Sequence, residues 1–157
     1  MTSVLLVCTA NICRSPMAEA LLRRKLAEED VPGEWQIGSA GAWAMEGLPA
    51  SKYGIEVMGE RGLDTRRHRS REVNTALMAE TDLVLTMTAG HAEALRAEFP
   101  LQAHKVFCLT EMAGRPYDVQ DPYGSSLADY RHTANELEQL IEQGLPRIIA
   151  LARPHPI

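Results

Sequence analysis

The residues best suited to chemistry lie close together near the N-terminus, in the segment CTANICRSP at positions 8–16. Three small or permissive residues, Thr9, Ala10 and Asn11, allow the backbone to curl so that successive N–H groups point inward and bind an anion. Asn11 also tolerates a left-handed conformation better than most residues. Arg14 supplies a planar fork of N–H donors that matches the geometry of a phosphate group. The segment therefore predicts a phosphate-binding loop.

A cysteine stands at the start of this loop, and it adds a nucleophile. A sulfur surrounded by N–H dipoles, a helix N-terminus and a guanidinium loses its proton more easily than a free thiol does. Cys8 is then a thiolate aimed at a bound phosphorus atom, and Ser15 can donate a hydrogen bond to its sulfur. A cysteine at a strand end by itself is more often a small buried hydrophobe. Its combination with Arg14 and Ser15 favours the nucleophile, and the missing GxxxxGK[ST] pattern argues against a nucleotide-binding loop.

The elements around the loop indicate how it is held. Residues 4–8 form a continuous apolar run, typical of a central strand buried on both faces, and a helix is expected from about Ser15. Downstream, short apolar runs alternate with helical patterns, as in a parallel sheet covered by helices. Further strands are expected at 35–40, 82–87 and 105–109, and further helices near 49–62, 73–80, 89–98 and after 126. Gly144 and Pro146 are expected to interrupt the last helix.

Length and composition exclude several classes of protein. The 157 residues suit a single domain over positions 1–157, with a tail at 154–157 that is expected to fray. A net charge of -5 argues against nucleic acid as the main partner, and no apolar run is long enough for membrane insertion. Three cysteines make no disulfide framework, and the N-terminus lacks a basic signal region. We expect a cytoplasmic monomer, and the five histidines show no metal-ligand spacing.

The chain also resembles a known family. The segment VCTANICRSPMAE at positions 7–19 is similar to the signature of the low-molecular-weight protein-tyrosine phosphatases, and the resemblance covers nearly the whole chain. It continues through SAG at 39–41, HRSR at 68–71 and DVQDPYG at 118–124. The family implies a three-layer α/β fold with a four-stranded parallel sheet flanked by helices on both faces. It also implies a reaction without metal or cofactor, in which Cys8 forms a phosphocysteine that water hydrolyses. Ala10 departs from the pattern, since the family usually has glycine there.

The resemblance assigns roles to further residues. Arg14 and the loop bind the phosphoryl oxygens, with substrate contacts expected from Thr9, Ala10, Asn11, Ile12, Cys13 and Ser15. Ser39 is expected to hydrogen-bond Asn11 and to hold the loop in shape. Cys13 either packs as a small residue or forms a reversible, protective disulfide with Cys8. The third cysteine, Cys108, is expected in the core.

A proton donor must also reach the leaving group. Asp121, before Pro122 in a Gly/Pro-rich loop, is the candidate general acid, and it would later take a proton from the attacking water. An aspartate before proline is by itself only a turn signal. Asp118, three residues earlier, is the reserve candidate. Trp43 and Tyr123 are expected to wall the pocket around a phenyl phosphate, or else to pack within their loops.

Ile12 and other segments of the chain give conflicting indications of the substrate. Protein-arginine phosphatases of the same family have a threonine at this position, whereas isoleucine offers apolar contact to an aromatic ring. Residues 118–124 and the helix after them nevertheless resemble that subgroup. We therefore expect phosphotyrosine in proteins as the substrate, with phosphoarginine as the alternative. Arsenate reductases share this fold but need two further cysteines to relay a disulfide, and only Cys108 lies outside the loop. An inactive anion-binding module does not explain why Cys8, Arg14 and Asp121 occur together.

Overall fold

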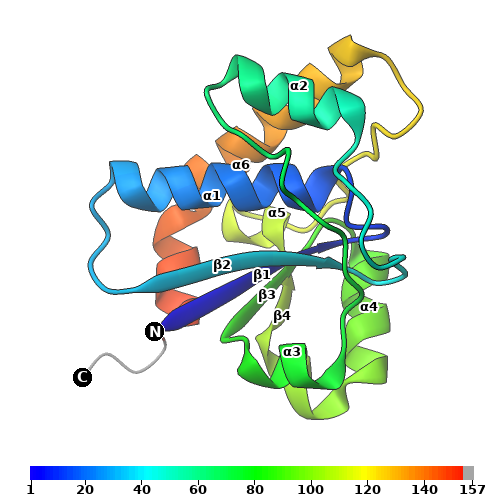
Figure 1. Cartoon of the computed structure of the whole chain (residues 1–157). Coiled ribbons are helices and arrows are strands. Elements are labelled where there is room, and N and C mark those ends of the chain that lie inside the picture. Colours follow the sequence, from blue (N-terminus) through cyan, green and yellow to red (C-terminus); the bar gives the residue numbers. More distant parts are fainter. Residues whose placement is uncertain (154–157) are drawn as a thin grey trace.

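The structure is a computed structural model that describes residues 1–153, so the expected frayed tail lies outside the described residues. Its centre is a sheet of four parallel strands in the order β2-β1-β3-β4 (Figure 1). The strands are β1 (Thr2–Cys8), β2 (Trp35–Gly41), β3 (Leu83–Thr86) and β4 (Val106–Cys108). The predicted α/β class with a four-stranded parallel sheet is confirmed.

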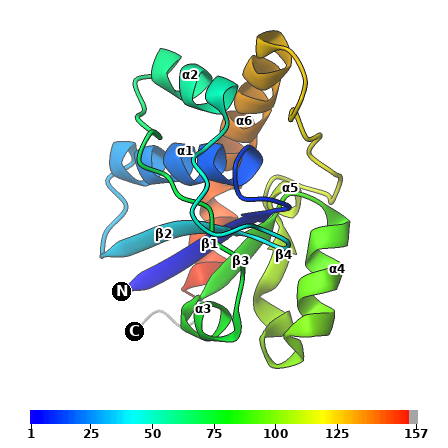
Figure 2. The same ribbon diagram turned by 45° about the vertical axis from the view of Figure 1, so that its right-hand side comes forward.

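Helices cover both faces of this sheet, which gives the three predicted layers (Figures 1 and 2). The longer helices on one face are α1 (Arg14–Glu28) and α6 (Leu127–Ala152), with the short α5 (Leu109–Met112) beside them and α2 (Lys52–Glu60) packed on α1 and α6. The opposite face carries α3 (Thr75–Glu80) and α4 (Ala89–Glu98), followed by the 3-10 helix η1 (Pro100–Lys105). Each face has its own apolar core.

Strand β1 is central because its side chains serve both cores. Val4 and Leu6 belong to the cluster under α1 and α6, whereas Leu5 and Val7 belong to the cluster under α3 and α4. All four side chains are at most 2% exposed, as the continuous apolar run predicts. Burial on both faces fixes the register of β1, and so it fixes where Cys8 emerges at the carboxyl edge of the sheet.

Two predicted helix starts have their caps in place. The Thr88 hydroxyl accepts a hydrogen bond from the backbone N–H of His91, 3.1 Å away, and so begins α4. The Ser126 hydroxyl accepts one from the N–H of Asp129 at 3.2 Å and begins α6. Side chains that satisfy these free N–H groups stabilise a helix by about 1 kcal/mol.

The chain differs from the prediction near its C-terminus. Helix α6 runs without interruption from Leu127 to Ala152, although Pro146 removes one backbone hydrogen bond. The helix continues because Leu145 and Ile148 on either side of Pro146 are buried in the core. Gly144 is not a break but a close contact, since a Cβ there would lie 2.6 Å from the Cβ of Met112 in α5.

Strand β4 also ends one residue earlier than predicted. The strand stops at Cys108, and residues Leu109–Met112 form the one-turn helix α5. A carboxylate oxygen of Glu111 accepts a hydrogen bond from the Cys108 backbone N–H at 2.7 Å, which turns the chain into this helix. Within the described part of the chain, no helix is long and apolar enough to cross a membrane.

Candidate active site

The loop between β1 and α1 is closed by a chain of hydrogen bonds beneath it. Asn11 adopts the expected left-handed conformation, with φ of 61°, and its side chain is fully buried. Its Nδ2 group donates to the Ser15 hydroxyl at 2.8 Å and to the Ser39 hydroxyl at 2.9 Å. The Ser15 Oγ lies 3.0 Å from the Cys8 sulfur. The predicted hydrogen bonds between Ser39 and Asn11 and between Ser15 and Cys8 are both present.

The direction of each hydrogen bond beneath the loop follows from which groups can donate. The Ser39 hydroxyl donates to Glu19 Oε1 at 2.7 Å and accepts from Asn11 Nδ2 at 2.9 Å. Because the other Asn11 N–H is donated to Ser15, the Ser15 hydroxyl keeps its own proton for the Cys8 sulfur. A donor aimed at the sulfur stabilises the thiolate and makes it a better leaving group.

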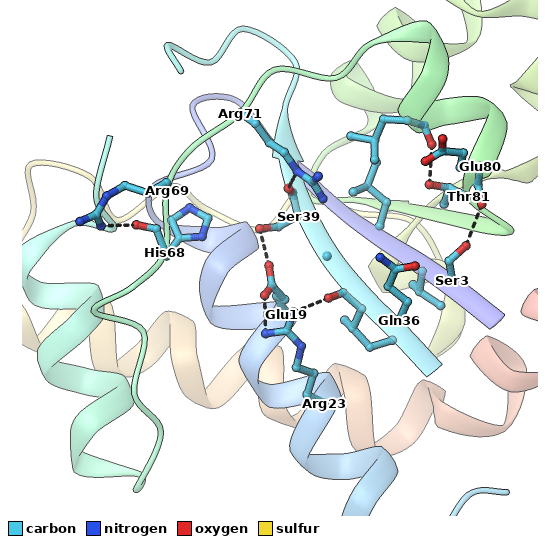
Figure 3. A pocket seen from close by; sticks show the side chains of 15 residues that line it. Ser3, Glu19, Arg23, Gln36, Ser39, His68, Arg69, Arg71, Glu80 and Thr81 are labelled. Atoms are coloured by element: carbon cyan, nitrogen blue, oxygen red, sulfur yellow. Dashed lines mark hydrogen bonds and ion pairs between the residues drawn. The ribbon is translucent and has the colours of Figure 1, made fainter. Parts of the chain in front are cut away.

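The hydrogen bonds beneath the loop are connected to β2 and to the segment before α3 through Arg71. The backbone N–H of Arg71 donates to Asn11 Oδ1 at 3.1 Å, and its Nε donates to the Ser39 carbonyl at 2.9 Å. Figure 3 shows Ser39 between Arg71 and Glu19, at a cavity of about 430 Å³ along β2. This cavity is lined by β2 and by residues of α1 and α3, and it contains no cysteine. The chemistry therefore lies on the other side of the loop.

The loop also explains why alanine replaces glycine at position 10. Among residues 1–153, the non-glycine residues with positive φ are Asn11 and Asp30, so Ala10 needs no left-handed conformation. Glycine is instead required at position 41, where a Cβ would lie 2.6 Å from the Thr9 carbonyl oxygen. The departure at position 10 is therefore sterically acceptable.

Arg14 is buried, and its guanidinium is only partly hydrogen-bonded by the described residues. The residue is 3% exposed, its Nη1 donates to the Val119 carbonyl at 2.9 Å, and its Nη2 lies 3.4 Å from the Thr9 hydroxyl. Its Nε is buried and has no hydrogen-bond partner in the described residues. A buried guanidinium N–H without an acceptor is costly unless a ligand supplies one. The first residue of α1 also stands at the positive end of the helix, which favours an anion.

A second cavity, of about 240 Å³, opens over this loop. It is lined by Cys8, Thr9, Ala10, Ile12, Cys13, Arg14, Asp121 and Tyr123. Asn11 and Ser15 do not line it, because their side chains lie buried beneath the loop. The structure thus brings together most of the predicted site residues on one cavity.

Trp43 is the exception among the predicted pocket walls. Its side chain is 80% exposed and does not line the cavity, whereas Tyr123 does so from the opposite loop. The backbone N–H of Trp43 donates to the Thr9 carbonyl at 2.9 Å, so this residue is held by its main chain while its ring remains in solvent. Of the two aromatic residues expected to line the pocket, only Tyr123 does so in this structure.

The two candidate acids occupy different positions. An Asp121 carboxylate oxygen lies 3.6 Å from Arg14 Nη2, at the mouth of the cavity that contains Cys8. The Asp118 carboxylate instead accepts a hydrogen bond at 2.9 Å from the N–H of Ala89, the first residue of α4. Asp118 is thus engaged in holding its loop against α4, which leaves Asp121 as the carboxyl at the cavity.

Cys13 is a free thiol at the start of α1. Its sulfur lies 3.4 Å from the Ser51 hydroxyl and 3.3 Å from the Tyr130 hydroxyl of α6. Burial raises the pKa of the Cys13 thiol and raises the pKa of Tyr130 to about 12. Cys13 therefore packs as a neutral thiol here, and its oxidation with Cys8 stays a prediction.

Two histidines that the sequence pattern did not single out contact the loop. His68 Nε2 lies 2.6 Å from the Asn11 carbonyl oxygen, and His91 Nε2 lies 2.8 Å from the Thr9 hydroxyl. Neither belongs to a metal cluster, since the described residues hold no group of three histidine, cysteine or acidic side chains suited to a metal ion. The only sequence signal for His68 is its place in HRSR, one of the segments that carry the resemblance, and His91 has none.

His91 makes a pH-dependent contribution to stability. Burial and the nearby Arg14 lower the pKa of His91 from 6.5 to about 4, against a smaller opposing effect of Asp118 and Asp121. The unfolded chain thus binds a proton in this window that the folded chain does not, so stability falls as pH falls from 6.5 towards 4. We expect the free energy of unfolding to drop by about 3 kcal/mol more for the wild type than for His91→Gln, measured by urea unfolding at pH 7 and pH 4. Parallel pH curves for the two proteins would contradict this.

A thiol and a buried arginine on one loop, with a carboxyl at the cavity mouth, define a cysteine-based phosphatase. The family assignment follows from the whole chain. Residues 3–152 match the model of the family "Low molecular weight phosphotyrosine protein phosphatase", and the chain belongs to this family.

Its relatives fall into two groups by the substrates in their names. A probable low molecular weight protein-tyrosine-phosphatase EpsP from Ralstonia nicotianae is 36% identical over 95% of this chain and 97% of that protein. A protein-arginine-phosphatase from Geobacillus stearothermophilus is 38% identical over 89% of this chain and 91% of that protein. A solved structure of the YwlE arginine phosphatase, a cysteine-to-serine mutant with a phosphorylated active-site serine, is 34% identical with a TM-score of 0.87, covering 94% and 95% of the two chains.

Proposed function

We propose that this protein hydrolyses phosphotyrosine in protein substrates through a phosphocysteine formed on Cys8. The observation that carries the proposal is the buried Arg14, whose Nε has no acceptor in the described residues, on the same cavity as the Cys8 thiol. A phosphate dianion would supply the missing acceptor and would place phosphorus over the sulfur. The phosphorylated active-site serine of the YwlE cysteine-to-serine mutant supports a covalent phosphoryl intermediate in this family.

The first step transfers the phosphoryl group to sulfur. The Cys8 thiolate attacks phosphorus in line, the bond from phosphorus to the phenolic oxygen breaks, and Asp121 gives its proton to the departing oxygen. Arg14 and the loop N–H groups hold the equatorial oxygens, where charge is redistributed in the transition state.

The second step returns the enzyme to its starting state. Asp121, now ionised, takes a proton from a water molecule that attacks the phosphocysteine. The bond from sulfur to phosphorus breaks, inorganic phosphate leaves, and the thiolate is regenerated with the hydrogen bond from Ser15. No step needs a metal or a cofactor. Substrate contacts are assigned to the loop, with Tyr123 as an aromatic wall at 65% exposure.

Ile12 supports tyrosine over arginine as the phosphorylated residue. It lines the cavity with Tyr123, so a phenyl ring meets apolar side chains on its way to Cys8. A guanidinium phosphate has additional N–H groups, and an isoleucine leaves them without a polar partner. Phosphoarginine is the second candidate because of the similarity to protein-arginine phosphatases.

Replacement of Ile12 by threonine tests this assignment. We expect Ile12→Thr to lower the ratio of kcat/KM for a phosphotyrosine peptide to that for a phosphoarginine peptide by about tenfold or more. Ile12→Val is the matched control, because valine has the shape of threonine without the hydroxyl, and it should keep the wild-type ratio. If the wild type already prefers phosphoarginine, the role given to Ile12 is wrong.

The remaining expectations concern the cell. A phosphorylated protein is the proposed partner, with neither nucleic acid nor a membrane involved. The cytoplasmic location and the monomeric state stay predictions.

A further inference from the structure

His91 lies in the first turn of α4, the helix that Figure 2 shows beside β3 and β4. It is 9% exposed, and its Nε2 lies 2.8 Å from the Thr9 hydroxyl oxygen. Its other ring nitrogen, Nδ1, is buried and has no hydrogen-bond partner in the residues that the structure describes. The imidazole is thus committed to a single polar contact, and this contact is with the residue that follows the nucleophile.

Thr9 links this ring to the phosphate-binding arginine. The Thr9 Oγ1 lies 3.4 Å from Arg14 Nη2, and because a guanidinium only donates, the hydroxyl oxygen is the acceptor. On the other side of the guanidinium, the Val119 carbonyl accepts from Nη1 at 2.9 Å. The guanidinium is thus held at Nη1 and Nη2, Nη2 also lies 3.6 Å from an Asp121 carboxylate oxygen, and Nε has no hydrogen-bond partner in the described residues.

We infer that His91 is a positioning residue for the phosphatase reaction and acts on Arg14 through the hydroxyl of Thr9. The inference rests on the proposed role of Arg14 in binding the phosphoryl oxygens. Without His91 the Thr9 hydroxyl is free to rotate, and the hydrogen bond that orients Arg14 Nη2 from the loop is lost, which leaves the exposed Asp121 as its other contact. Because Arg14 binds most tightly when charge is redistributed on the equatorial oxygens, a small change in its orientation lowers the rate.

The electrostatics of the site require a neutral ring at this position. Three charged groups lie close enough to affect its protonation: Arg14 from the loop, and Asp118 and Asp121 from the segment before α6. A second cation beside Arg14 would repel it and would compete for the same anions. Burial keeps the imidazole uncharged at neutral pH, so it serves as a hydrogen-bonding group without adding charge.

Three variants test the inference. His91→Phe fills the space without a hydrogen bond, His91→Gln keeps an amide group that reaches Thr9, and Thr9→Val removes the hydroxyl. We expect kcat/KM to fall about tenfold in His91→Phe and in Thr9→Val, no further in the double variant, and to recover in His91→Gln. His132→Phe, an exposed histidine of α6, is the control and should keep the wild-type rate.

Two substrates with different leaving groups distinguish a positioning role of His91 from a role in proton transfer. p-Nitrophenyl phosphate has a good leaving group and phenyl phosphate a poor one, and His91→Phe should lower kcat/KM for both by the same factor, because the proton donor is untouched. The rate of Cys8 alkylation by neutral iodoacetamide should stay unchanged, because the loop itself is intact. If His91 only filled space, His91→Phe would keep the wild-type rate and His91→Gln, which fills the space less well, would be the variant that loses activity.

Each remaining outcome is decisive. Additive losses in the double variant, unequal losses for the two esters or an unchanged rate in His91→Phe would overturn the inference and leave the proposed function standing. A wild type that hydrolyses neither ester would instead contradict the proposed function itself.

Discussion

Replacement of Cys8 by serine is expected to lower kcat for aryl phosphate hydrolysis by about 10⁴-fold or more, because a hydroxyl is a far weaker nucleophile than a thiolate. Binding of inorganic phosphate should persist, since Arg14 and the loop N–H groups remain. Steady-state kinetics with p-nitrophenyl phosphate measures the first effect, and isothermal titration calorimetry with phosphate measures the second.

Cys108→Ser is the matched control for this substitution. Cys108 is a buried thiol at the end of β4, on the opposite core from the catalytic loop, and its replacement should leave kcat close to the wild-type value. A Cys8→Ser variant with near-normal turnover would show that another group attacks phosphorus.

Replacement of Asp121 by alanine is expected to separate substrates by their leaving groups. A poor leaving group needs a proton as its bond to phosphorus breaks, so kcat/KM for phenyl phosphate should fall by about 10²- to 10⁴-fold. p-Nitrophenyl phosphate leaves as a stable anion and should lose far less. The comparison of the two esters on the wild type and Asp121→Ala measures this difference.

Asp118→Ala provides the corresponding control, because this carboxylate accepts a hydrogen bond from the start of α4 and does not line the cavity. It should lower both rates by a similar, small factor. Equal losses for the two esters in Asp121→Ala, or a leaving-group effect in Asp118→Ala instead, would remove Asp121 from the acid role.

The parts of the fold that local patterns determine were predictable. A continuous apolar run is typical of a strand buried on both faces, and β1 has both faces in separate cores. The left-handed Asn11 and the capping hydroxyl of Thr88 follow from the chemistry of single residues. For the same reason the sequence of the loop with Cys8 and Arg14 is enough to predict an anion site there.

Features that depend on distant contacts were not predictable. Pro146 is a helix-breaking signal, but the buried neighbours of Pro146 in the core outweigh the lost hydrogen bond. Trp43 is an aromatic residue in a loop near the site, yet only the path of the main chain decides that its ring faces solvent. His91 meets Thr9 across 82 positions in the sequence, and no local pattern signals that contact.

The central claim is that Cys8 carries the phosphoryl group during turnover, and rapid acid quench with a ³²P-labelled aryl phosphate tests it most directly. We expect at most one labelled phosphoryl group per chain, attached to the peptide that contains Cys8, and its loss at the rate of phosphate release. The Cys8→Ser variant should carry no phosphorus–sulfur bond. Turnover without any protein-bound label on Cys8 under conditions that slow the second step, such as Asp121→Ala with p-nitrophenyl phosphate, would contradict it.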